Sequence, residues 1–149
     1  MIMKEWVVDT WVLATCHATD CGDCIDCLNF LTNLEKKGKL CLDHEGEIYK
    51  EYKPYIRPRT PVFWWWYRMI GQVGHLCYQS NSLAGRHVRR LVNNLNFDND
   101  DIKFVGVASR SGDKIIVSGD SGYNANVCKY LQSMLRIKVM YPSCASNNI

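Results

Sequence analysis

Two apolar stretches of the chain each run into an acidic side chain. The apolar run of WVVDTWVL ends at Asp9, and the β-branched run of KIIVSGDSGY stops two residues before Asp120. Both runs have the composition of buried strands. Ligands of parallel sheets bind beyond the carboxyl ends of the strands. We therefore expect Asp9 and Asp120 to lie close together if their strands are neighbours.

Two further acids could reach the same edge of the sheet. Asp101 begins the helix that leads into the second strand, and Glu51 lies in the short helical segment EIYKEY. Asp98 and Asp100 compete with Asp101, and Glu47 competes with Glu51. We prefer Asp101 because the sequence DIKF best continues the helix. Each acid taken alone also has an ordinary structural role open to it, in a turn or at a helix N-terminus.

Such a group of carboxylates would need protons or a cation. At about 4 Å and an effective dielectric constant near 20, each like-charged pair costs on the order of 4 kcal/mol. Oxygen ligands alone suit Mg²⁺ or Mn²⁺. Such an ion lowers the pKa of a bound water and holds phosphate oxygens during in-line attack. The acids thus indicate phosphodiester hydrolysis.

Strands and helices are expected to alternate along the chain. The strands are predicted at Glu5–Val8, Lys39–Asp43, Lys114–Ser118 and Ile137–Tyr141. The helices are predicted at Asp23–Lys36, Val62–Gln79, Arg86–Leu95, Asp101–Arg110 and Asn124–Leu135, with a short helical segment ahead of Pro54 and a loop from Asp9 to Gly22. This alternation predicts an α/β fold with a parallel sheet between helices, in a single domain spanning residues 1–149.

The composition is that of a globular protein. The chain has 149 residues, 47% of them hydrophobic, and a net charge of +3, so charge alone does not indicate a nucleic-acid binder. The N-terminus lacks the apolar core of a signal peptide, and no stretch is apolar enough to span a membrane. We expect a cytoplasmic protein without a membrane partner, whose eight cysteines are mostly reduced.

Four motifs of the chain resemble those of PIN-domain nucleases, a family that includes small bacterial toxins. They are VVDTWVL, EIYKEY, FDNDDIKFVGVAS and IIVSGDSGY, and they occur in the family's order. The resemblance implies a PIN-like three-layer α/β/α fold. It also implies metal-dependent cleavage of single-stranded RNA, and in toxins neutralisation by an antitoxin.

The resemblance assigns roles to individual residues. The catalytic acids would be Asp9, Glu51, Asp101 and Asp120. Asp9, Asp101 and Asp120 would bind Mg²⁺ or Mn²⁺ directly, and Glu51 would bind the metal or orient a metal-bound water. Thr10 and Ser118 would support them. Trp11 stands where the family usually has Asn.

A cluster of cysteines follows the first strand. CHATDCGDCIDC contains Cys16, Cys21, Cys24 and Cys27, a set that could bind zinc or an iron–sulfur cluster. Zinc sites more usually pair two separated CxxC units, and the other four cysteines are isolated in the sequence. On the predicted helix, Cys24 and Cys27 share a stripe with leucines, which favours a core role. A metal or redox role stays open.

Basic and aromatic residues could bind RNA or a partner. Arg86, Arg89 and Arg90 share one helix face and Lys103 is near Asp101, so these four could contact phosphates, although a solvated basic face is the simpler interpretation. At least one tryptophan of FWWWY should reach the surface, where it could pack against an antitoxin or a second copy in a homodimer. The alternative function is a non-catalytic RNA-binding or protein-interaction module; a third is a cysteine-based sensor.

Overall fold

The structure is a computed structural model that describes residues 2–19 and 22–149. It contains a single five-stranded sheet in which every pair of neighbouring strands is parallel. The order across the sheet is β3–β2–β1–β4–β5. The strands are β1 (Lys4–Val8), β2 (Gly38–Asp43), β3 (Leu76–Gln79), β4 (Ile115–Val117) and β5 (Lys138–Met140). The first strand of the chain is therefore the central one.

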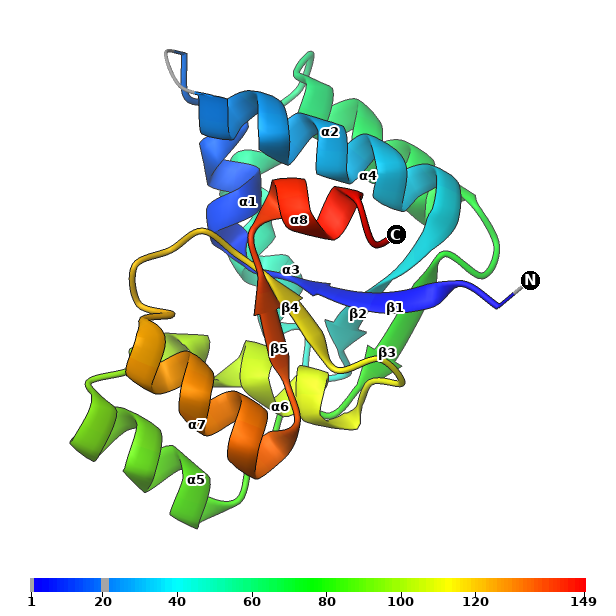
Figure 1. Ribbon diagram of the computed structural model, residues 1–149. Coiled ribbons are helices and arrows are strands. Elements are labelled where there is room, and N and C mark those ends of the chain that lie inside the picture. The colour runs from blue at the N-terminus through cyan, green and yellow to red at the C-terminus, as the bar shows by residue number, and fades with distance from the viewer. Residues whose placement is uncertain (1, 20–21) are drawn as a thin grey trace.

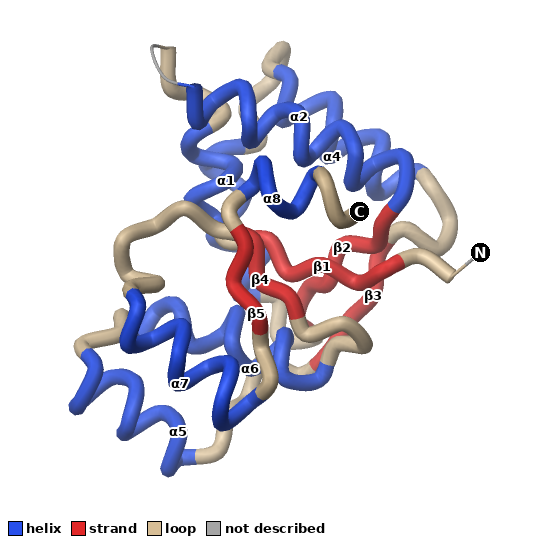
Figure 2. The backbone as a smooth tube through the Cα atoms, in the orientation of Figure 1, coloured by secondary structure: helices blue, strands red, loops and turns tan. Residues whose placement is uncertain are grey.

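Helices cover both faces of this sheet, as Figures 1 and 2 show. One layer comprises α1 (Thr10–Thr15), α2 (Gly22–Lys37), α4 (Pro61–Gly71) and α8 (Pro142–Ser146). The other comprises α5 (Gly85–Arg89), α6 (Ile102–Arg110) and α7 (Ala125–Leu135). The short helix α3 (Glu47–Tyr52) follows β2. The predicted fold class is confirmed: this is a three-layer α/β/α fold with a parallel sheet, consistent with a PIN-like fold.

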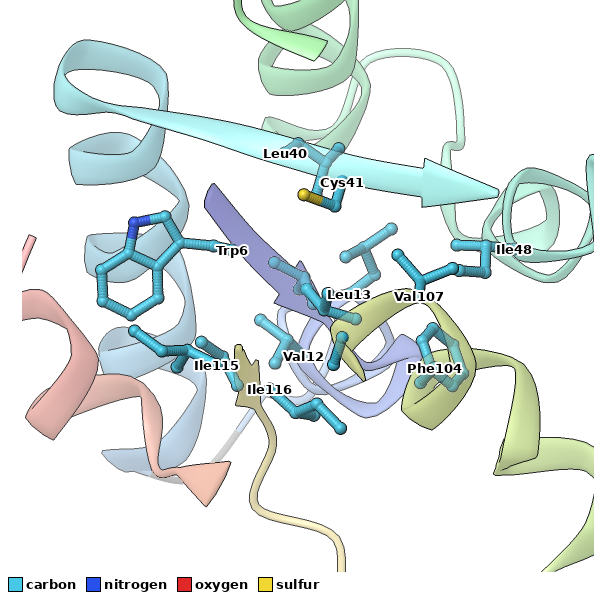
Figure 3. Packing of buried hydrophobic residues seen from close by; sticks show 14 of the residues in the cluster. Trp6, Val12, Leu13, Leu40, Cys41, Ile48, Phe104, Val107, Ile115 and Ile116 are labelled. Carbon is cyan, nitrogen blue, oxygen red and sulfur yellow. The ribbon is translucent and has the colours of Figure 1, made fainter. Parts of the chain in front are cut away.

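The core joins both layers through the central strand. Trp6 of β1 is fully buried, and its ring meets Phe30 of α2 edge to face, with centroids 5.7 Å apart. Side chains alternate along a strand, so Val7 faces the opposite layer, where α6 packs on β1 and β2. Figure 3 shows Phe104 and Val107 of α6 on that side of the core. The central strand is thus held from both faces, which fixes the position of the residue that follows it.

Three elements differ from the predictions. The predicted helix Val62–Gln79 is wrong beyond Gly71, because the chain turns there, passes through Gly74 with a positive φ of 85°, and forms β3. The predicted loop from Asp9 contains helix α1. Helix α8 was not predicted: Pro142, the residue after the predicted last strand, occupies its first turn, where the missing N–H of proline costs nothing.

The predicted helix over Arg86–Leu95 is α5 followed by a π-helical turn, Arg90–Asn94. Short 3₁₀ turns cover Lys53–Tyr55 and Asn99–Asp101. Among the described residues, no helix is long and apolar enough to cross a membrane.

Candidate functional site

Asp9 lies at the junction of β1 and α1. Its backbone N–H donates to Val117 O of β4, at 3.0 Å, and Asp9 is also the residue immediately before the first turn of α1. The side chain is 2% exposed, and the Ser118 hydroxyl donates to its Oδ2 at 2.6 Å. Burial raises the pKa of Asp9 to about 6, and the Asp120 and Glu51 charges add to this while the Ser118 hydrogen bond opposes it.

Glu51 and Asp101 bring their carboxylates to Asp9. One carboxylate oxygen from each of the three lies within 4.8 Å of the others. Glu51 is positioned by its neighbour Tyr52, whose buried hydroxyl donates to Val8 O at 2.5 Å, and by Thr10, whose hydroxyl donates to Glu51 Oε1 at 2.5 Å. Helix α3 is thereby tied to the end of β1. We call Asp9, Glu51 and Asp101 the acid cluster.

Asp101 has a more strongly raised pKa than Asp9. Burial raises its pKa to about 7, with further contributions from Asp9, Asp98, Glu51 and Asp120. Its neighbours in the sequence, Asp98 and Asp100, do not belong to the acid cluster. Asp98 Oδ1 accepts the Asp100 N–H at 2.9 Å, and both of these residues are exposed. Glu47 is also exposed, in the first turn of α3. Of the competing acids, Asp101 and Glu51 are therefore the ones that join Asp9 in the acid cluster.

Asp120 lies beside the acid cluster, and its charge raises the pKa values of Asp9 and Asp101. Its position is fixed by its loop: its N–H donates to Ser118 Oγ at 3.0 Å, and its Oδ1 accepts the Gly122 N–H at 2.9 Å. Ser118 thus bonds Asp9 through its hydroxyl proton and Asp120 through its oxygen. The two strand ends are coupled by one side chain, as expected for neighbouring strands β1 and β4.

Trp11 covers this loop. A Cβ atom at Gly119 would lie 2.3 Å from the Trp11 ring, so only glycine fits between Ser118 and Asp120. The rings of Trp11 and Tyr141 lie 6.1 Å apart. The residue that departs from the family's usual Asn therefore has a packing role here.

Lys103 is the one cation paired with an acid of this cluster among the described residues. Its ammonium group pairs with Glu51 and donates to Asp100 O, and its side chain is 15% exposed. The pair offsets part of the negative charge of four carboxylates. Lys103 thus lies inside the site rather than on open surface, and its predicted contact with nucleic acid stays a prediction.

The predicted arginines lie on a separate surface. Arg86, Arg89 and Arg90 are exposed, and none forms an ion pair with another described residue. His87 Nδ1 and the Tyr130 hydroxyl are hydrogen-bonded at 2.7 Å, which joins this segment to α7. Within the described part of the chain, no hydrogen bond or ion pair joins these three arginines to the acid cluster.

Tyr123 is a site residue that sequence reasoning missed. Its hydroxyl is buried and has no hydrogen-bond partner among the described residues. Burial, and then the charges of Asp9, Asp101 and Asp120, raise its pKa well above the usual value, so it stays protonated beside the acids. Its place three residues after Asp120 in the strand-end loop was the only sequence signal.

The cysteines confirm the predicted core role for Cys27 but differ from the prediction at Cys41 and Cys77. Cys27 is fully buried on the core face of α2, and a hydrogen bond with the Cys16 thiol, followed by burial, raises its pKa. Cys21 lies outside the described residues. Cys41 and Cys77, which the sequence places far from any other cysteine, are not isolated: their Sγ atoms are 2.6 Å apart.

The acid cluster fits a hard divalent cation. All its donors are oxygens, and the pKa values of Asp9 and Asp101 are raised by burial and, to a smaller extent, by the neighbouring carboxylate charges. A divalent cation would replace those protons and relieve the repulsion. Comparisons of the chain with protein families, with curated proteins and with solved structures gave no match.

Proposed function

We propose that the protein is a Mg²⁺- or Mn²⁺-dependent endoribonuclease that cleaves single-stranded RNA. The observation that carries this proposal is the convergence of Asp9, Glu51 and Asp101 within 4.8 Å, at the carboxyl edge of a parallel sheet. An ordinary surface cluster of acids would spread apart. These acids are held together by hydrogen bonds from Thr10 and Ser118.

The chain's own residues divide the work of hydrolysis. Asp9, Asp101 and Asp120 would bind the cation, which supplies Lewis acidity toward phosphate and a water of lowered pKa. Glu51, a member of the acid cluster, would bind the cation or orient a metal-bound water, and Thr10 and Lys103 hold its two carboxylate oxygens in place. Lys103 then stays near the phosphate as a positive charge.

RNA is the substrate class that the surface supports. Arg90 lies with Lys129 and Tyr130 along a shallow pocket of about 260 Å³. Arg86 and Arg89 extend this basic surface on α5. Unpaired cations and an aromatic side chain suit a flexible phosphate chain with accessible bases.

A protein partner is the second part of this proposal. Three apolar side chains of α4 are exposed, Trp64 by 50%, Tyr67 by 62% and Ile70 by 50%. The predicted surface tryptophan is thus Trp64, while Trp65 and Trp66 are buried. Such rings are typical anchors of protein interfaces. An antitoxin that covers α4 would fit the toxin function, and a second copy of the chain is the alternative occupant.

The test is cleavage of a mixed single-stranded RNA by the purified protein with Mn²⁺, with Mg²⁺ and with a chelator. We expect metal-dependent cleavage that Asp101→Asn lowers by at least about 100-fold, because a metal ligand is lost. Asp100→Asn is the matched control: it removes the adjacent, exposed carboxylate and should keep full activity. Equal activity of the two variants, or no cleavage by the folded wild type with either metal, would overturn the proposal and favour a non-catalytic module.

A further inference from the structure

A second group of metal-ligating side chains lies on the sheet itself. Glu5 of β1, Cys41 of β2 and Cys77 of β3 each contribute a ligand atom, and these atoms all lie within 4.8 Å of one another. Cys41 and Cys77 are directly opposite residues of paired strands. Glu5 of β1 is paired with Lys39 of β2, and Cys41 lies two residues further along β2, so Glu5 and Cys41 are on the same face of the sheet. We call this group the thiol cluster.

The distances suit a tetrahedral ion. Both thiols donate to the same oxygen, Glu5 Oε1, with sulfur–oxygen distances of 3.6 Å from Cys41 and 3.5 Å from Cys77. Two ligands of a tetrahedral zinc ion, one sulfur and one oxygen, lie about 3.6 Å apart. Two zinc-bound sulfurs lie about 3.8 Å apart. The Sγ atoms are 2.6 Å apart, so they would have to separate by about 1.2 Å to bind one zinc ion together.

The charges of the group call for a cation. Within the described residues, the two thiols are the only donors to the Glu5 carboxylate. The neighbouring thiol, burial and the Glu5 charge all raise the pKa of Cys41. A disulfide would remove both donors and leave the carboxylate facing two sulfurs with nothing to neutralise it. A divalent ion satisfies all three ligands at once.

The surroundings fix Glu5 and leave the group accessible. A Cβ atom at Gly112 would lie 2.7 Å from Glu5 Oε2, so a glycine gives the carboxylate its space. The Glu5 N–H donates to Asp113 Oδ2 at 2.8 Å, which holds this part of β1 against the same loop. Cys41 is buried, whereas Glu5 and Cys77 are partly exposed, so an ion and a water can reach the group.

We propose that Glu5, Cys41 and Cys77 form a zinc site that joins strands β1, β2 and β3, with water as the fourth ligand. Thiolate ligands favour zinc over Mg²⁺ or Mn²⁺. Binding releases the two thiol protons and leaves two thiolates and one carboxylate on Zn²⁺, so charge and atoms balance. This site is separate from the acid cluster and independent of the proposed nuclease function.

Cobalt substitution tests the site, because thiolate-bound Co²⁺ absorbs strongly in the near ultraviolet and oxygen-bound Co²⁺ does not. The reduced, metal-free protein is titrated with Co²⁺ and then with Zn²⁺. We expect one equivalent of Co²⁺ to produce thiolate absorption that Zn²⁺ removes. Cys77→Ser should abolish it, and Glu5→Gln should weaken Co²⁺ binding by at least about 10-fold. Cys144→Ser, an exposed cysteine on α8, is the matched control and should change nothing.

Three results would overturn the proposal. The first is the absence of thiolate absorption in the reduced wild-type protein. The second is absorption that survives in Cys77→Ser but disappears in Cys24→Ser, which would assign the metal to the CxxC segment. The third is a Cys41–Cys77 disulfide, found by peptide mapping without reductant, in protein purified without zinc. Circular dichroism of each variant shows whether the fold is kept, and Glu5→Gln leaves both thiols in place if Cys77→Ser does not fold.

Discussion

Strand β1 carries an acid near each end, and the two acids have different neighbours. Glu5 faces two thiols from strands on one side, whereas Asp9 meets oxygens from α3, the turn before α6 and the loop after β4. The first set suits a thiophilic ion and the second a hard one. A single strand can thus serve two sites of different chemistry, because its two ends meet different parts of the fold.

The two sites also differ in how their residues are brought together. The thiol cluster uses side chains of paired strands, so the register of the sheet alone places Cys41 opposite Cys77. The acid cluster uses residues beyond the strands. Glu51 is held by the Thr10 hydroxyl, which donates to its carboxylate, and by Tyr52, whose hydroxyl ties the same helix to Val8 O. The acid cluster therefore has more ways to be disturbed by a single substitution.

The largest predicted effect is a dependence of stability on pH that belongs to the acid cluster alone. The pKa of Asp9 is raised from 3.8 to about 6, so the folded protein binds this proton more tightly than the unfolded chain does. The tighter binding of this proton stabilises the folded protein fully below pH 3.8. This stabilisation, about 3 kcal/mol of the free energy of unfolding, is lost as the pH rises to about 6.

This pH dependence is measured as the free energy of unfolding in urea, with a chelator present, for the wild type and Asp9→Asn between pH 4.5 and 7. The wild type should lose stability relative to the variant as the pH rises. Cys77→Ser should follow the wild type, because the raised pKa of Cys41 keeps that thiol protonated in this range. Parallel curves for wild type and Asp9→Asn would contradict the raised pKa.

The next effect separates the two sites by metal. At a concentration about 100 times its dissociation constant, a bound ion adds about 2.7 kcal/mol of stability, or roughly 5–10 °C in melting temperature. Zn²⁺ should raise the melting temperature of the wild type and Asp101→Asn but not that of Cys77→Ser. Mn²⁺ should raise the melting temperature of the wild type and Cys77→Ser but not that of Asp101→Asn. A variant that loses both responses would show that the sites are not independent.

Glycines beside the two sites should respond unequally to alanine. In Gly119→Ala the new Cβ meets the rigid Trp11 ring at 2.3 Å, so we expect a loss of about 1–3 kcal/mol. In Gly112→Ala it meets the end of the flexible Glu5 side chain, which can move away. Urea unfolding should show the smaller loss for Gly112→Ala, and Zn²⁺ binding should weaken only in that variant. Equal losses would argue against the close packing of Trp11.

The smallest effect concerns Ser118. Ser118→Ala removes the hydroxyl that donates to Asp9 Oδ2 at 2.6 Å, a loss of about 1 kcal/mol. Because that bond lowers the pKa of Asp9, the pKa should rise further, and the Mn²⁺ needed for half-maximal cleavage at pH 6 should increase. The Mn²⁺ requirement of each protein is measured by titrating cleavage with Mn²⁺ at pH 6 and at pH 8. The difference between Ser118→Ala and the wild type should be smaller at pH 8. An unchanged requirement at pH 6 would contradict the coupling.

Local patterns in the sequence were enough to predict the strands β1, β2, β4 and β5 and the edge at which Asp9 lies. Strand β3 was missed because the apolar residues of GQVGHLCYQS were read as the end of an aromatic helix, although Gly71 and Gly74 interrupt it. That error also hid the thiol cluster, since a cysteine on a helix cannot be paired in register with Cys41. The position of Tyr123 depends on tertiary packing, for which the sequence offers no periodic signal.

The strand order has a consequence for folding during synthesis. Strands β1, β2 and β3 are neighbours in the sheet and also the first three strands of the chain, so they can pair before β4 exists. All three residues of the thiol cluster have been synthesised once residue 77 is added. The acid cluster must wait for Asp101, and β1 gains its second neighbour only later still. On a nascent chain the proposed zinc site would therefore be complete before the proposed nuclease site.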